Sequence, residues 1–187
     1  MISELVKKNR SYRRFDSSVK ITEGEMRSMI ESARCSASAA NRQRIRFALV
    51  SSKLECDTVF ANIKLAGYLK DWQGPSESER PTAYVILATK EEKLDTPLAV
   101  DLGIAAQSIL LTATEMGFGG CMILSFDHAA VDALIRNDEY KSALVIALGK
   151  PSERVYLTDV KDGDIKYFRD ENDDHAVPKL SLDELII

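Results

Sequence analysis

The chain has 187 residues, of which 45% are hydrophobic and 29% are charged, and its formal net charge is −4. These values describe one globular domain that can bury a sizeable core, and the acidic balance argues against non-specific binding to nucleic acid. No uncharged apolar run reaches the ~20 residues of a membrane-spanning helix, and the first residues lack the basic and then apolar pattern of a signal peptide.

The cysteine and histidine positions indicate neither a disulfide framework nor a metal site. The three cysteines, at 35, 56 and 121, are an odd number and form no Cys-x-x-Cys pair. The two histidines, His128 and His175, lack metal-ligand spacing. A reducing cytoplasm is therefore the expected setting.

Residues 9–15, Asn-Arg-Ser-Tyr-Arg-Arg-Phe, place three arginines and a serine in a short stretch of this acidic chain. Taken alone, the stretch is either a solvated basic patch or a site that holds an anion. Residues 3–8 are expected to form a short helix before it. After it, Thr22 and Glu25 form a Ser/Thr-x-x-Glu capping box, which predicts a helix over 23–35.

Small and polar residues fill positions 36–44, where the backbone can approach a ligand closely or form an ordinary polar loop. Apolar residues predict a strand over 46–51, and an amphipathic helix is expected over 54–66. From 67 to 81 the pattern breaks up into a surface loop that carries aromatic residues. This loop is either a lid or an irregular connection pinned by Trp72.

The second half of the chain begins with a nearly continuous apolar run at 83–89, which is typical of a central strand. Pro97 can start the longest helix, which runs to Met116. This helix is apolar enough to be buried on more than one side, as a core helix or as a subunit interface. Its polar residues fall on one narrow stripe, formed by Asp101, Ser108, Thr112 and Glu115.

Residues 117–120, Gly-Phe-Gly-Gly, end this helix and lead into a strand at 121–124. A dinucleotide-binding turn runs from strand to glycines to helix, so this order is not that fingerprint, and no Walker A sequence is present. Asp127 is expected to cap a further helix, and residues 143–149 to form another buried strand. The charged tail contains a turn at 161–164.

Alternating strands and helices predict an α/β protein of four or five strands, in one domain over 1–187. The segment 170–187 has an acidic stretch followed by apolar residues, and we expect it to dock on a partner subunit. No GxSxG elbow or histidine–cysteine arrangement supports nucleophilic catalysis, and no pair of carboxylates stands out. If the protein is an enzyme, a bound cofactor carries its chemistry.

Five segments, in order along the chain, resemble motifs of the nitroreductase family of FMN enzymes. Residues 10–15 resemble its Arg-Ser-x-Arg-x-Phe opening, and residues 38–47 its Ser-Ala-Gly-Asn-x-Gln-Pro-Trp-x-Phe stretch. Residues 101–119 resemble its central helix and glycine turn, residues 147–151 its Leu-Gly-Tyr-Pro, and residues 177–181 its terminal Val-Pro-Lys-Arg-Ser. The resemblance implies an α/β (α+β) fold with a central mixed sheet of four to five strands flanked by helices, in an intertwined homodimer.

The resemblance also implies a flavin site shared between two subunits. Arg10, Ser11 and Lys179 are the candidates for the FMN phosphate, to which arginine can give bidentate hydrogen bonds. Arg13 matches a position that directs a basic side chain toward the N1–C2 carbonyl edge of the flavin. A positive charge at that edge would favour the anionic reduced flavin.

The remaining candidates surround the ring. Ser38 and Ala39 would let the backbone approach it, and Asn41 would offer hydrogen bonds; in the family this stretch comes from the other subunit. The strand backbone around Ile123 and Leu124 would lie by the N5 edge of the ring.

The chain departs from the family pattern at several positions. Asn9 and Leu180 stand where arginines are usual, so two basic phosphate contacts are missing, and Arg14 is a partial substitute for them. Ala40 stands at a usual glycine, and Arg44 replaces a proline. Further replacements occur at Ala37, Ile45 and Leu124; Arg44 and Tyr68 are candidates for shaping an unusual substrate pocket.

The activity implied by the resemblance is that of an FMN-dependent oxidoreductase. It would take hydride from NADH or NADPH and reduce a quinone, nitroaromatic or similar acceptor in a ping-pong cycle, with neither a protein nucleophile nor a metal. Two alternatives stay open: the same fold with a different flavin reaction (flavin destructase, dehalogenase or azoline oxidase), and a flavin-binding protein without turnover. The sequence identifies neither the acceptor nor the choice of nicotinamide.

Overall fold

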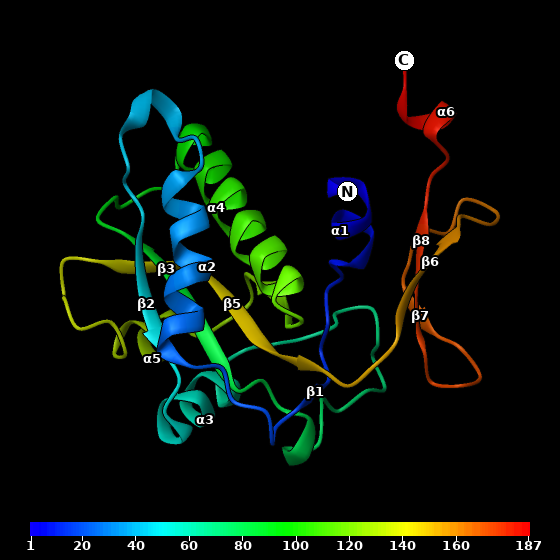
Figure 1. Ribbon diagram of the computed structural model, residues 1–187, viewed down its shortest axis with the longest axis horizontal. Coiled ribbons are helices and arrows are strands. Elements are labelled where there is room, and N and C mark those ends of the chain that lie inside the picture. The colour runs from blue at the N-terminus through cyan, green and yellow to red at the C-terminus, as the bar shows by residue number, and fades with distance from the viewer.

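A five-stranded sheet forms the centre of the computed structural model, which describes all 187 residues (Figure 1). Its longest strand, β5 (Lys141–Pro151), pairs antiparallel with β3 (Ala83–Thr89) along one edge and with β4 (Gly119–Ile123) along the other. β2 (Arg46–Val50) pairs antiparallel with β3 and ends the sheet on that side, and β1 (Phe15–Asp16) pairs with the end of β5. The apolar runs at 83–89 and 143–149 are therefore the central strands, as predicted.

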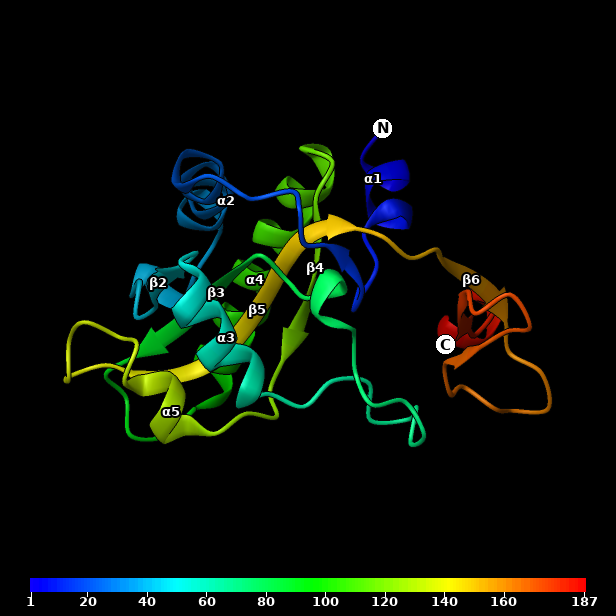
Figure 2. The ribbon, with the colours of Figure 1, turned by 90° about the horizontal axis from the view of Figure 1, so that it is seen from below.

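Helices cover both faces of this sheet (Figure 2). α2 (Glu23–Cys35) and α4 (Thr96–Glu115) pack on one face, and α3 (Lys53–Ala61) and α5 (His128–Asp132) on the other. Alternate residues of β3 serve the two layers, because successive side chains of a strand point to opposite faces. The predicted α/β fold, with helices flanking a central sheet of four to five strands, is confirmed, but the sheet is not mixed, because every strand pairing in it is antiparallel.

Local signals set most helix boundaries. The capping box of Thr22 and Glu25 is present at the start of α2, and the Asp127 side chain accepts a hydrogen bond from Ala130 N–H at the start of α5. α3 ends at Ala61, five residues before the predicted end at 66. The chain leaves the helix there because Lys64 N–H donates to Ser125 O (2.8 Å), in a short pairing with the segment after β4.

Two residues of the polar stripe of α4, Ser108 and Thr112, face α2, whereas Asp101 contacts the loop at Ala39 and Glu115 is exposed. Thr112 Oγ1 donates to Ser32 Oγ of α2 (2.7 Å), and the hydroxyls of Ser36 and Ser108 lie 2.7 Å apart in the same seam. α4 is the one helix long and apolar enough to cross a membrane, and eight of its residues are buried against α2 and the sheet. The expectation that this helix is buried on more than one side holds, while Val100 remains 54% exposed.

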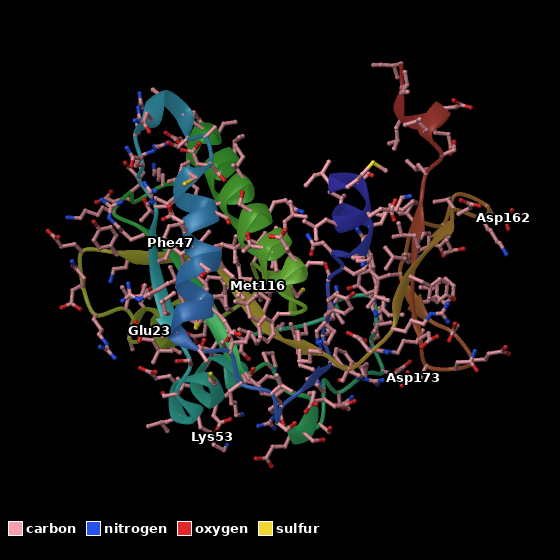
Figure 3. All side chains as sticks on the ribbon, in the orientation of Figure 1. Glu23, Phe47, Lys53, Met116, Asp162 and Asp173 are labelled. Carbon is pink, nitrogen blue, oxygen red and sulfur yellow. The ribbon has the colours of Figure 1, made fainter.

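A second, three-stranded sheet follows the core and lies beside α1 (Ile2–Lys8) (Figure 1). Its strands are β6 (Val155–Asp159), β8 (His175–Lys179) and β7 (Phe168–Arg169), with β6 and β8 parallel. Asp162, in the predicted turn at 161–164, and Asp173 lie at opposite ends of this sheet (Figure 3). The chain then ends in α6 (Leu182–Leu185), in which no residue is buried.

Candidate functional site

A cavity of about 440 Å³ lies between α1, α4, β4 and the second sheet, and we call it the basic cavity. It is lined by Val6, Asn9, Arg10, Ser11, Arg13, Gln107, Leu110, Met122, Tyr167, His175, Val177 and Lys179. Three of these side chains are cationic and none is a carboxylate. The cavity therefore suits an anionic ligand that also carries apolar surface.

Glycines of β4 hold the basic segment in place. Ser11 forms an isolated parallel bridge with Gly120, and Tyr12 N–H donates to Gly120 O (3.1 Å). A Cβ on Gly120 would lie 2.3 Å from the carbonyl oxygen of Ala147, and one on Gly119 would lie 2.5 Å from the Tyr12 ring. Because glycine has no Cβ, β4 can approach both β5 and the segment that carries Arg10 and Arg13 this closely.

Arg13, which is 9% exposed, has a guanidinium that no carboxylate neutralises. Its Nη1 donates to Ser11 O (3.1 Å) and lies 3.5 Å from His175 Nε2, while its Cζ lies 4.8 Å from the centroid of the Tyr167 ring. The nearby carboxylate of Glu153 instead accepts the backbone N–H of Arg13 (2.5 Å) and a bond from Arg169 Nη2 (2.7 Å). The positive charge of Arg13 thus remains available to a ligand.

Three buried nitrogens of the basic cavity have no hydrogen-bond partner: Arg10 Nε, Arg13 Nε and His175 Nδ1. Buried donors are normally satisfied, so such a group at a cavity favours an acceptor-rich ligand. Burial and the adjacent Arg13 charge lower the pKa of His175 to about 4, so its imidazole is neutral at neutral pH.

Four predicted site residues, Arg10, Ser11, Arg13 and Lys179, meet in the basic cavity. The side chains of Ile123 and Leu124 do not line it: Ile123 packs in the core on the other face of β4, and Leu124 is 75% exposed beyond the strand, while the predicted approach of their backbone to a flavin ring stays a prediction. Met122 lines it instead, because alternate strand residues share a face. Alternation along 119–123 places Gly120 and Met122 on one face, and the tertiary fold determines that this face lines the cavity.

One of the other predicted residues, Ser38, lines a second cavity of about 260 Å³, which we call the loop cavity. It is lined by Ile30, Ala33, Arg34, Ser36, Ala37, Ser38, Gln43, Arg44, Ile45, Arg46, Phe47, Asp101 and Ala105. Ala39 N–H donates to Oδ1 of the buried Asp101 (2.8 Å), and Asn41 is exposed beside it. Asp101 precedes Gln107 of the basic cavity by six residues, about 9 Å along α4 and on a different side of the helix.

Within one chain, therefore, Ser38, Ala39 and Asn41 do not meet the basic cavity. Their loop lies at the start of α4, whereas the basic cavity lies beside α1 (Figure 1).

The backbone of this loop is strained. Ala40, Asn41 and Gln43 have φ values of 50°, 52° and 48°, in the left-handed region that favours glycine. Arg44 anchors the loop through two hydrogen bonds to the Asp95 carboxylate (2.9 and 3.0 Å), which also caps α4. Arg44 thus lines the loop cavity while its guanidinium is held by Asp95.

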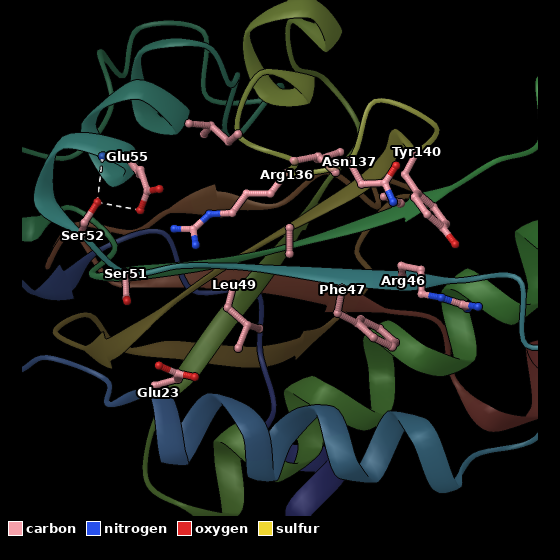
Figure 4. Close-up of a pocket in the computed structure, with 14 residues that line it drawn as sticks. Glu23, Arg46, Phe47, Leu49, Ser51, Ser52, Glu55, Arg136, Asn137 and Tyr140 are labelled. Carbon is pink, nitrogen blue, oxygen red and sulfur yellow. Dashed lines mark hydrogen bonds between the residues drawn. The ribbon is translucent and has the colours of Figure 1, made fainter.

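A third and larger cleft, of about 720 Å³, lies along the free edge of β2 (Figure 4). Its charged residues include both Glu23 and Glu55 and both Arg46 and Arg136, so it has no excess positive charge. Ser52 in its wall donates to Glu55 Oε2 (2.6 Å) and caps α3. None of the predicted flavin-site residues lines this edge cleft, and the basic cavity is the better anion site.

The family model described as "Nitroreductase family" matches residues 6–150, and the chain belongs to this family of oxidoreductases. A nitroreductase family protein from Streptococcus pneumoniae TIGR4 has a similar structure, with a TM-score of 0.70 at 18% identity over 100% of this chain and 99% of that one. An FMN-dependent nitroreductase from Clostridium difficile R20291 gives 0.66 at 22% identity over 92% and 99% of the two chains.

A nitroreductase from Exiguobacterium sibiricum 255-15, solved in complex with FMN, gives a TM-score of 0.65 at 18% identity over 82% of this chain and 89% of that one. These identities establish the shared fold. A comparison with curated proteins finds no match.

Proposed function

We propose that the protein is an FMN-dependent oxidoreductase that takes hydride from NADH or NADPH and reduces a small acceptor such as a quinone or nitroaromatic. The observation that carries this proposal is the basic cavity, where three cationic side chains and no carboxylate surround buried donors without partners. A phosphate dianion joined to a flat, partly polar ring matches that combination. The names of the FMN-binding relatives add support.

Each residue of the cavity has a distinct role in this proposal. Arg10 and Lys179 supply charge to the phosphate, the exposed Ser11 supplies a hydroxyl, and Arg13 directs its charge toward the ring. Asn9, 8% exposed at the end of α1, offers an amide where the family often has arginine. Bound FMN supplies the hydride chemistry, while the chain binds and orients it.

We further propose that the complete site is built by a homodimer. A second copy would bring Ser38, Ala39 and Asn41 to the basic cavity, because one chain keeps the two groups apart. Apolar residues that need cover lie on α4 and in the C-terminal segment, namely Val100, Leu182, Leu185, Ile186 and Ile187. In this arrangement 170–187 docks on the partner subunit.

The oligomeric state can be measured by light scattering on wild type and on a chain that ends at Leu180. A dimeric wild type and a weaker dimer after truncation support the proposal. A monomeric wild type contradicts it.

A cytoplasmic location fits this proposal, because Cys35, Cys56 and Cys121 are all free thiols.

Absorption spectroscopy of the purified protein, with added FMN if needed, tests the proposed activity. The protein should show a flavin spectrum that NADH or NADPH bleaches without oxygen. A protein that cannot be reconstituted with FMN refutes the proposal.

A flavin-binding protein without turnover is the second candidate, favoured by Asn9 and the partly exposed Leu180 at usual arginine positions. Bound flavin that neither nicotinamide bleaches would select this candidate.

A further inference from the structure

His175 is fully buried in the wall of the basic cavity, and nothing in its surrounding sequence indicates a functional role. Its ring lies 5.1 Å from the Tyr167 ring, centroid to centroid, with an interplanar angle of 33°. Its Nε2 lies 3.5 Å from Arg13 Nη1, and its Nδ1 has no partner. A buried imidazole thus lies against the guanidinium assigned to the flavin ring.

The chemistry of the two groups determines the form of the imidazole. A guanidinium only donates hydrogen bonds, so Nε2 must face Arg13 with its lone pair. The ring hydrogen then lies on Nδ1, where no acceptor of the chain receives it. A protonated imidazole would instead place two cations side by side in a buried site, which is strongly unfavourable.

The charges around Arg13 explain why a neutral imidazole beside its guanidinium affects the charge that a ligand meets. Glu153, whose side chain is 3% exposed, is held by Arg169, and it already accepts the backbone N–H groups of both Arg13 and Arg14. An Arg13 guanidinium that turned to Glu153 would have its charge neutralised before reaching a ligand. Tyr167 and His175, whose rings pack against each other, offer the guanidinium a π face and a neutral acceptor instead.

We propose that His175, together with Tyr167, is a positioning residue that holds Arg13 toward the basic cavity with its charge uncompensated. The free Nδ1–H is then a donor that an acceptor on the bound ligand would satisfy. This inference rests on the proposed function and adds to it a residue that sets both the affinity for FMN and the midpoint potential of bound FMN.

Two substitutions distinguish a positioning role of His175 from a role in packing alone. His175→Phe keeps an aromatic ring but removes the acceptor, whereas His175→Gln keeps an acceptor and a donor. We expect His175→Phe to weaken FMN binding about tenfold, the loss of roughly one hydrogen bond to a charged group, and to make the midpoint potential of bound FMN more negative. His175→Gln should stay within about threefold of wild type.

Fluorescence titration and spectroelectrochemistry of wild type and both variants supply these values. Equal affinity and potential in His175→Phe and wild type would overturn the assignment, and so would a His175→Gln variant as weak as His175→Phe. A purely packing role predicts the first outcome, because phenylalanine keeps an aromatic ring at this position.

The tautomer of His175 provides a test that needs neither variant nor FMN. ¹⁵N NMR of the wild-type apoprotein at neutral pH should show a neutral imidazole protonated at Nδ1. A ring protonated at Nε2, or a cationic ring, overturns the assignment. If wild type binds no FMN, the proposed function fails, and the NMR result still decides the relation between His175 and Arg13.

Discussion

The basic cavity and the loop cavity are built in opposite ways. In the basic cavity the backbone is packed against glycines of β4, and cationic side chains lack carboxylate partners. In the loop cavity Arg44 is paired with Asp95 and Oδ1 of Asp101 with the Ala39 N–H, although Arg44 Nε and Asp101 Oδ2 have no partner, while the backbone at 40–43 is strained. The first region suits an anionic ligand, and we propose that the second presents its loop to a partner subunit.

The largest effect is expected where the basic segment meets β4. Gly120→Ala places a methyl group 2.3 Å from Ala147 O, which should lower the free energy of unfolding by about 3 kcal/mol and disturb the Ser11 bridge. Gly67→Ala is the matched control, because nothing lies within 4 Å of its Cβ position. Urea unfolding measures both; equal stability would show that the close approach of β4 to β5 does not require glycine at position 120.

Loss of the Arg13 guanidinium should affect ligand binding more than stability. Arg13→Met is expected to weaken FMN binding by about ten- to a hundredfold, because charged hydrogen bonds contribute about 1.5–3 kcal/mol. Arg27→Met removes an exposed arginine paired with Glu23 on α2 and should leave binding unchanged. Fluorescence titration provides the comparison, and unchanged affinity in Arg13→Met would refute its role.

Loss of the buried Asp101 carboxylate, which lines the loop cavity, should lower the free energy of unfolding. Asp101→Ala leaves the Ala39 N–H without its acceptor and should cost about 2 kcal/mol in the free energy of unfolding. Asp101→Asn retains a carbonyl oxygen and should lose much less. Chemical denaturation tests this pair, and equal losses would mean that the hydrogen bond does not hold the loop.

The pH dependence of stability should report on the basic cavity. The pKa of His175 is lowered from its usual value of 6.5 to about 4 in the folded chain, so between these values the unfolded chain binds more protons. The contribution of His175 to the free energy of unfolding is therefore fully present above pH 6.5, and it is lost as pH falls toward 4. Unfolding measured at several pH values should show this slope in wild type, and His175→Phe should reduce it; identical slopes contradict the prediction.

The smallest effect concerns loop strain. Ala40 has a φ of 50°, so Ala40→Gly should relieve strain and raise the free energy of unfolding by up to about 1 kcal/mol. Ala37→Gly, outside the left-handed region, should be neutral or destabilising. A lower melting temperature for Ala40→Gly would show that the loop does not store strain.

The contrast between the cavities also explains what sequence reasoning could predict. The arginines at 10 and 13, the caps of α2 and the apolar runs of β3 and β5 are local signals, and each was predicted. His175 and Tyr167 reach Arg13 only through the tertiary fold, across 162 and 154 positions of the chain respectively. Their sequence surroundings, an acidic tail and a turn, contain no pattern that would reveal this contact.

The backbone conformation of the loop at 40–43 and the end of α3 also could not be predicted from the sequence. Of the left-handed residues at 40, 41 and 43, only Asn41 is of a type that adopts this conformation readily, and alanine and glutamine do not indicate it. The early end of α3 likewise depends on the pairing of Lys64 with Ser125, which local propensity does not contain.

A titration of the wild-type apoprotein with FMN, followed by flavin fluorescence, tests whether the basic cavity holds FMN. We expect saturable binding at one FMN per chain, because each basic cavity of the proposed homodimer is completed by the partner's loop. Absence of saturable binding, or saturation at half that stoichiometry, would contradict it.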